Sequence, residues 1–117
     1  MTTPSDVQHV HHPSLAAGRW RTLSLMEQLG NLGSEVERAF RAHQHGRTER
    51  FERALDRALE LFDLTANDQR WRGHRRREVL RAREQFCRVF FDESVEAGLA
   101  EYLSKYFLQF AVAARSQ

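Results

Sequence analysis

The chain has few residues that cross-link a fold or interrupt its helices: one cysteine, two prolines and six glycines among 117 residues. The single cysteine, Cys87, excludes an internal disulfide and any metal site built from several cysteines. Scarce proline and glycine leave long uninterrupted segments, which favours helix. No run alternates apolar and polar residues as a strand does, and no apolar run is long enough to span a membrane. The N-terminus also lacks a basic segment followed by an apolar one, so we expect a cytoplasmic protein with no membrane contact.

Four segments instead carry apolar residues at helical spacing. The first begins near Ser24, where Ser24 and Glu27 match a capping box, and ends before Gly46. The others are expected at about 48–64, 74–91 and 95–114. Short connections make successive helices antiparallel. The sequence therefore predicts an all-α, antiparallel up-down-up-down four-helix bundle over residues 21–115, preceded by a disordered N-terminal tail over residues 1–20.

Three features predict how these helices pack. Gly30 and Gly33 fall inside the first helix, where each costs about 1 kcal/mol relative to alanine, so we expect a neighbouring helix or an aromatic ring to approach closely there. Gly98 is a similar glycine inside the fourth helix. Trp71 is expected to fold back over the end of the bundle. Six aromatic residues are expected to form a layer between the last two helices: Phe86, Phe90, Phe91, Tyr106, Phe107 and Phe110.

Positive charge is concentrated in the third helical segment. The net charge of the chain is only +2, but residues 70–88 hold eight arginines and two glutamates, while residues 92–101 hold four acids and no base. Five basic residues recur at helical spacing opposite the apolar face: Arg70, His74, Arg77, Arg81 and Arg88. Such a face predicts a surface for nucleic acid or for an acidic protein. The alternative is an ordinary solvated helix face.

No catalytic, metal or cofactor motif stands out. Glu-x-x-His pairs, zinc-protease spacing, a phosphate-binding glycine loop and a Gly-x-Ser-x-Gly turn are all missing from the sequence. His9, His11 and His12 cluster in the predicted tail, which is typical of a solvated end rather than a metal site. We expect no cofactor and no metal.

A ribonuclease of the toxin kind is the one enzymatic alternative. Such enzymes carry an arginine and a histidine a few residues apart at a helix end, and Arg38 with His43, or with His45, has that separation. The histidine would serve as general acid and base, and the arginine would bind the scissile phosphate. Ala39 occupies the place beside the arginine where those enzymes carry a polar residue.

Four segments resemble an uncharacterised prokaryotic family of small four-helix-bundle proteins: WRTLSLMEQLGNLGSEVERAF (20–40), RALELFDLT (57–65), RWRG (70–73) and YFLQFAVAAR (106–115). The resemblance spans most of residues 20–115 and implies the bundle fold, but no established activity. In architecture the chain also resembles the ribosomal-insertion-associated bundles and the basic accessory proteins of diversity-generating retroelements. The sequence motifs of those accessory proteins are missing here, so that similarity concerns the fold alone.

Together these observations predict a non-enzymatic accessory or interaction protein that binds nucleic acid or an acidic protein surface through the basic face of residues 70–88. The alternatives are the ribonuclease built on Arg38 and His43, and a purely structural bundle that associates with itself into a homo-oligomer.

Overall fold

The computed structural model describes residues 18–116, and all of its regular structure there is helical. A short helical turn at 18–20 precedes four long helices: α3 (Leu25–Gln44), α4 (Thr48–Ala66), α5 (His74–Phe91) and α6 (Leu99–Arg115). The predicted all-α class is confirmed. None of the helices in this part of the chain combines the length and the hydropathy needed to cross a membrane.

Helix α3 forms where the capping box predicts it. The Ser24 hydroxyl accepts a hydrogen bond from the Glu27 amide at 3.1 Å, and the Glu27 carboxylate accepts one from the Ser24 amide at 2.9 Å. The apolar stripe of the helix is buried along its whole length, at Leu25, Leu29, Leu32, Val36 and Phe40. A helix with one continuous buried face can hold a core between several neighbours.

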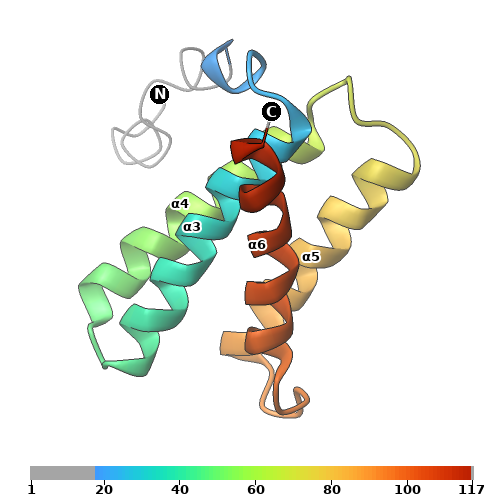
Figure 1. Cartoon of the computed structure of the whole chain (residues 1–117). Coiled ribbons are helices and arrows are strands. Elements are labelled where there is room, and N and C mark those ends of the chain that lie inside the picture. Colours follow the sequence, from blue (N-terminus) through green and yellow to red (C-terminus); the bar gives the residue numbers. More distant parts are fainter. Residues whose placement is uncertain (1–17, 117) are drawn as a thin grey trace, which may run out of the picture.

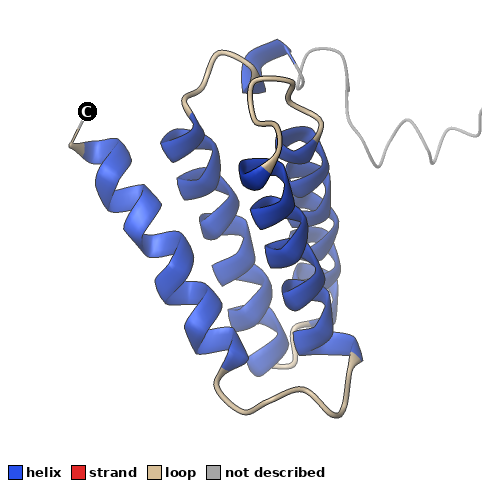
Figure 2. Cartoon of the chain, turned by 90° about the vertical axis from the view of Figure 1, so that its right-hand side faces the viewer, coloured by secondary structure: helices blue, strands red, loops and turns tan. Residues whose placement is uncertain are grey.

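Two of those neighbours, α4 and α6, pack closely on α3, and α5 packs on α4 and α6 (Figures 1 and 2). The glycines of α3 explain the approach of α6. A Cβ atom on Gly33 would lie 2.5 Å from the Cβ of Phe107, and one on Gly30 would lie 3.1 Å from the Cα of Ala111. The predicted close approach of a helix and an aromatic residue is therefore confirmed. Both glycines allow α6 to pack closely against α3 within the same chain.

Phenylalanine rings connect the helices through the core. Phe86 of α5 contacts Phe40 of α3 and Phe62 of α4, with ring centroids 5.8 and 5.6 Å apart, and Phe62 also contacts Phe107 of α6. The prediction of a layer confined to the last two helices is wrong in its extent. Phe91 lies at the edge of the aromatic cluster: its ring contacts Phe90, with centroids 6.2 Å apart, but its side chain is 67% exposed.

The start of α6 also differs from the prediction. Residues 92–98 form a loop in which Asp92 accepts hydrogen bonds from the amide and the hydroxyl of Ser94. Gly98 does not lie inside a helix. It has φ +90° and precedes the first residue of α6, so the chain turns in a conformation that residues with side chains rarely adopt.

The N-terminal end of α3 is closed by buried polar side chains. Trp20, which the sequence assigns to the tail, is buried, and its indole Nε1 donates to Thr65 Oγ1 at 2.9 Å. Residues 1–17 of the predicted tail, including the three histidines, lie outside the described residues. Trp71 covers the same end as predicted, and its Nε1 donates to Gln28 Oε1 at 2.7 Å.

Candidate anion-binding groove

The predicted basic face of residues 70–88 is divided by the structure. Arg70 lies in the loop before α5, and its guanidinium binds the buried carboxylate of Asp68 at 2.7 Å and donates to the Leu23 carbonyl at 2.8 Å. This pairing lowers the pKa of Asp68 to about 2 and raises the pKa of Arg70. The guanidinium also stacks 4.6 Å above the Trp71 ring. Arg70 therefore holds the loop to the end of the bundle.

Other basic groups of this segment are paired as well. Arg88 binds Asp92 at 3.0 Å, and the His74 ring lies 3.5 Å from Glu78. The pKa of Asp92 is lowered, first by the hydrogen bonds from Ser94 and then by the one from Arg88. Arg77 and Arg81 are exposed on α5. These two arginines have no acidic partner among the described residues, whereas His74, although 81% exposed, lies beside Glu78.

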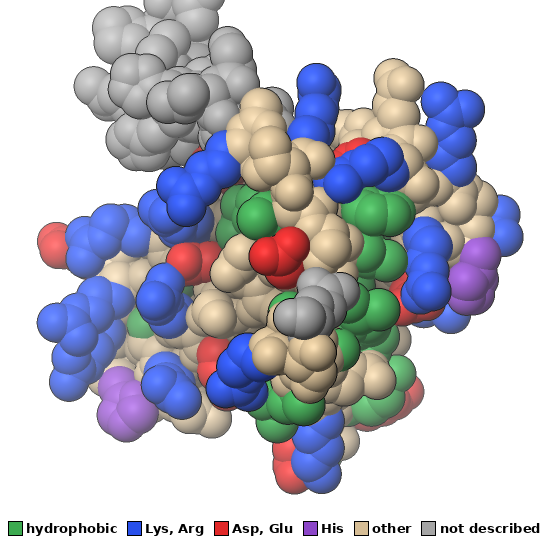
Figure 3. Space-filling model, turned by 45° about the horizontal axis from the view of Figure 1, so that its top comes forward, with side chains coloured by type: hydrophobic (Ala, Val, Ile, Leu, Met, Phe, Trp, Pro, Cys, Tyr) green, Lys and Arg blue, Asp and Glu red, His purple; other side chains and the backbone are tan. Residues whose placement is uncertain are grey.

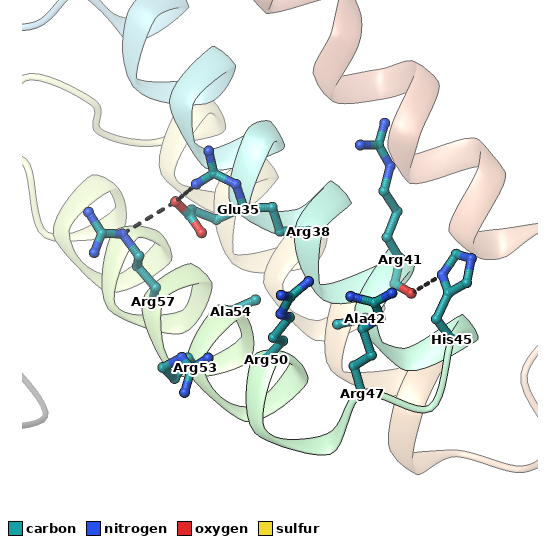
Figure 4. Close-up of a pocket in the computed structure, with 10 residues that line it drawn as sticks. All are labelled: Glu35, Arg38, Arg41, Ala42, His45, Arg47, Arg50, Arg53, Ala54 and Arg57. Carbon is teal, nitrogen blue, oxygen red and sulfur yellow. Dashed lines mark hydrogen bonds and ion pairs between the residues drawn. The ribbon is translucent and has the colours of Figure 1, made fainter.

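A second basic surface lies between α3 and α4, where no site is predicted from the sequence. A groove of about 740 Å³ runs along the two helices and their connection (Figure 4). Its buried alanines, Ala42 of α3 and Ala54 of α4, leave room between the helices because their side chains are short. Its other lining residues are Glu35, Arg38, Arg41, His45, Arg47, Arg50, Arg53 and Arg57.

Glu35 fixes one end of this groove. Its side chain is only 9% exposed, and its Oε1 lies 2.6 Å from Arg38 and 3.3 Å from Arg57. Arg57 comes from α4, so this carboxylate links the two helices. Glu35, Arg38 and Arg57 therefore form one cluster in which the carboxylate is buried and the two arginines are largely exposed. The shared carboxylate orients two guanidinium groups at the groove.

The remaining groups make the groove strongly positive. Six arginines and one glutamate line it, which gives a charge of +5 with His45 neutral. Arg41, Arg47, Arg50 and Arg53 are exposed at its rim. Glu35 is the only acidic side chain among the described residues that line it. In the space-filling view, Lys and Arg side chains cover the left flank, where α3 and α4 lie, as well as the right (Figure 3).

The groove also contains part of the predicted ribonuclease pair. Arg38 and His45 both line it, but His43 does not. The His43 ring packs against Phe51 and Phe90 instead, with centroid distances of 5.1 and 5.0 Å. His45 Nδ1 lies 2.8 Å from the Arg41 carbonyl oxygen, which can only accept. Nδ1 therefore donates, and Nε2 is the nitrogen left to accept a proton.

The lone thiol lies elsewhere and is not activated. Cys87 is half-buried on α5, and burial raises its pKa. Among residues 18–116, no three histidine, cysteine or acidic side chains come together as a metal site would require.

The groove is hard to see in the sequence because its charges are spread over two helices and mixed with acids. A usable signal does exist. Arginines recur every three or four residues on both sides of the short connection 45–47, and folding that connection into a hairpin places residues 38 and 41 opposite residues 50–54. Comparison of the chain with protein-family models, curated proteins and solved structures gives no match.

Proposed function

We propose that this protein is a non-enzymatic interaction module that binds the phosphate backbone of nucleic acid in the α3–α4 groove. The observation that carries the proposal is the set of six arginines that line one groove, whose positive charge is opposed by a single glutamate. A protein that neutralises several phosphates releases condensed counterions, which gives affinity that depends on salt and not on sequence.

The composition of the groove favours contacts to the backbone over contacts to bases. No phenylalanine, tyrosine or tryptophan is among its described lining residues, so the groove has no side chain on which bases stack. The guanidinium groups suit phosphate because each presents two parallel donors. Arginine is the common base throughout this chain, so the clustering of the arginines around the groove, and not their abundance, supports phosphate binding.

The scaffold for this site is, in our proposal, an antiparallel up-down-up-down bundle of the four long helices. Each helix packs on its neighbours in the chain, and the first also packs on the last. Outside the groove, the exposed Arg77 and Arg81 of α5 form a smaller basic surface, which we propose as an auxiliary contact for the same ligand.

Binding of labelled single- and double-stranded oligonucleotides at two salt concentrations tests the proposal. The double variant Arg50→Glu/Arg53→Glu should weaken binding by at least tenfold and flatten the salt dependence, because two phosphate contacts become repulsive. The matched control is Arg77→Glu/Arg81→Glu, which makes the same change of charge on α5 and should have the smaller effect.

Three results would contradict this assignment. Wild-type protein that fails to bind at low salt excludes nucleic acid as the ligand. A larger loss in the α5 variant moves the site to the face of residues 70–88. Binding of an acidic protein that competes with the oligonucleotide for the groove indicates that the site is a general one for anions.

A second candidate function, a metal-independent ribonuclease, is supported by one observation: Arg38 and His45 share the groove. His45 Nε2 would accept the proton of a ribose hydroxyl, and Arg38 would bind the scissile phosphate. Shortened RNA in the binding experiment, with cleavage lost in His45→Ala but kept in His43→Ala, would favour it. Cleavage lost only in His43→Ala would instead favour the pair of Arg38 and His43.

A further inference from the structure

Two of the six groove arginines are held in place by an acid of the groove itself. Arg38 of α3 and Arg57 of α4 both contact one atom, Glu35 Oε1, at 2.6 and 3.3 Å (Figure 4). The side chain of Glu35 is 9% exposed, whereas those of Arg38 and Arg57 are 67% and 70% exposed. A buried anion therefore holds two guanidinium groups, one from each wall, at the same point of the groove.

The contacts with Glu35 use only a small part of each guanidinium. The carboxylate oxygen takes one nitrogen from each group, Nη1 of Arg38 and Nε of Arg57. A guanidinium carries five N–H donors, so each arginine has donors beyond those that Glu35 uses. Two positive charges and one negative charge meet here, so one further monoanion would balance the cluster. A phosphate diester is such a monoanion, and its two charged oxygens match the paired donors of a guanidinium.

The cluster also lowers the entropic cost of binding. An exposed arginine such as Arg50 loses side-chain freedom when it binds a ligand. Arg38 and Arg57 have given up much of that freedom in the folded protein, because Glu35 holds them from below. Groups that are ordered before binding contribute more to affinity than equally charged groups that are ordered by it.

We propose that Arg38 and Arg57, positioned by Glu35, form a clamp that binds one phosphate diester of a nucleic-acid backbone. This inference rests on the proposed function and states which part of the groove determines its affinity. Glu35 is a positioning residue in this arrangement, since it acts through the two arginines. The other arginines of the groove attract the strand on either side of the clamp.

Charge-conserving variants separate the clamp from general attraction. Arg38→Lys/Arg57→Lys keeps both charges but removes both guanidinium groups, and it should weaken binding of a labelled single-stranded oligonucleotide by about tenfold. Arg41→Lys/Arg50→Lys makes the same change at one exposed residue of each helix and should stay within about twofold of wild type. The salt dependence should be the same in all three proteins, because the number of positive charges is unchanged.

Replacement of Glu35 gives a second test, in which the direction of the effect decides. Glu35→Gln makes the groove more positive, so general attraction predicts tighter binding. The clamp predicts binding weaker by about threefold, because the two guanidinium groups lose the anion that orders them. Glu49→Gln is the matched control: Glu49 lies beside Arg47 and Arg50 but outside the cluster, so its replacement should tighten binding slightly. Circular dichroism shows whether each variant is folded.

The outcomes distinguish the clamp from the function on which it rests. Wild-type protein that binds no oligonucleotide at low salt contradicts both proposals. Wild-type binding that Arg50→Glu/Arg53→Glu weakens, with both lysine variants equal to wild type, overturns the clamp alone and leaves a diffuse basic groove. Tighter binding by Glu35→Gln also overturns the clamp, and the cluster is then a brace between α3 and α4.

Discussion

At the scale of single residues, a buried polar cluster at the N-terminal end of α3 holds three segments together. The Gln28 amide nitrogen donates to the Trp20 carbonyl at 2.8 Å and to Asp68 at 3.0 Å, and Asp68 also receives the Arg70 guanidinium. All buried side-chain nitrogens and oxygens within residues 18–116 have a partner. Such a cluster stabilises the fold only while all of its members are present, because an unpaired buried group is costly.

Replacing Asp68 should therefore lower the free energy of unfolding by more than the small change in its side chain suggests. Asp68→Asn keeps the shape but removes the charge, and we expect a loss of about 2–3 kcal/mol in the free energy of unfolding, as for other charged hydrogen bonds. Asp63→Asn is the matched control. Its carboxylate also binds an arginine but is 58% exposed, so it should cost less than about 1 kcal/mol. Urea denaturation measures both, and equal losses would contradict the role of the cluster.

The same carboxylate should make stability depend on acid. Its pKa in the folded protein, about 2, is lower than its ordinary value of 3.8, so the folded state favours the charged form. This contribution is fully present above about pH 4 and is lost as the pH falls through 2. Urea midpoints measured from pH 6 to pH 2 should drop more in the wild type than in Asp68→Asn. Parallel curves for the two proteins would show that Asp68 is not responsible.

At the scale of secondary-structure elements, the contact between α3 and α6 depends on the missing side chain of Gly33. Alanine is the better helix former by about 1 kcal/mol, which predicts stabilisation if the helix is considered alone. A Cβ atom there would lie 2.5 Å from Phe107 Cβ, an atom fixed to its backbone, so the helices would have to move apart. The packing term should outweigh the propensity term.

Gly33→Ala should accordingly lower the free energy of unfolding by about 1–2 kcal/mol, since overpacking costs about 1–3 kcal/mol. Asn31→Ala changes an exposed position of the same helix and should be neutral or slightly stabilising. Thermal unfolding followed by circular dichroism compares the two variants. A Gly33→Ala protein more stable than wild type would mean that α6 adapts to the added methyl group.

Helix positions were predictable wherever local signals decide them. The predicted 48–64 and 74–91 agree with α4 and α5 to within two residues, and the capping box gives the start of α3. The start of α6 was missed because Gly98 reads as a helix interior in sequence, and only its backbone angle shows a turn. Phe91 fits the helical stripe of Phe86 and Phe90 poorly, and the structure turns it outward.

At the scale of the whole molecule, the charges could be counted from the sequence but not assigned to a surface. The dense run of arginines at 70–88 predicts a binding face, yet Arg70 and Arg88 form ion pairs with carboxylates of the same chain. The groove arises only when α3 and α4 lie side by side, because each helix supplies half of it. Which arginines remain exposed to a ligand is therefore a property of the tertiary structure.

Both tryptophans lie at one end of the molecule, so its intrinsic tryptophan fluorescence comes from that end alone. Trp20 and Trp71 are the only tryptophans in the sequence, and both bind groups at the end of the bundle where α3 begins. The arginine groove extends toward the opposite end, at the connection between α3 and α4. Indole fluorescence is thus a local signal: it reports the opening of the polar cluster, while a ligand seated among the arginines is invisible to it.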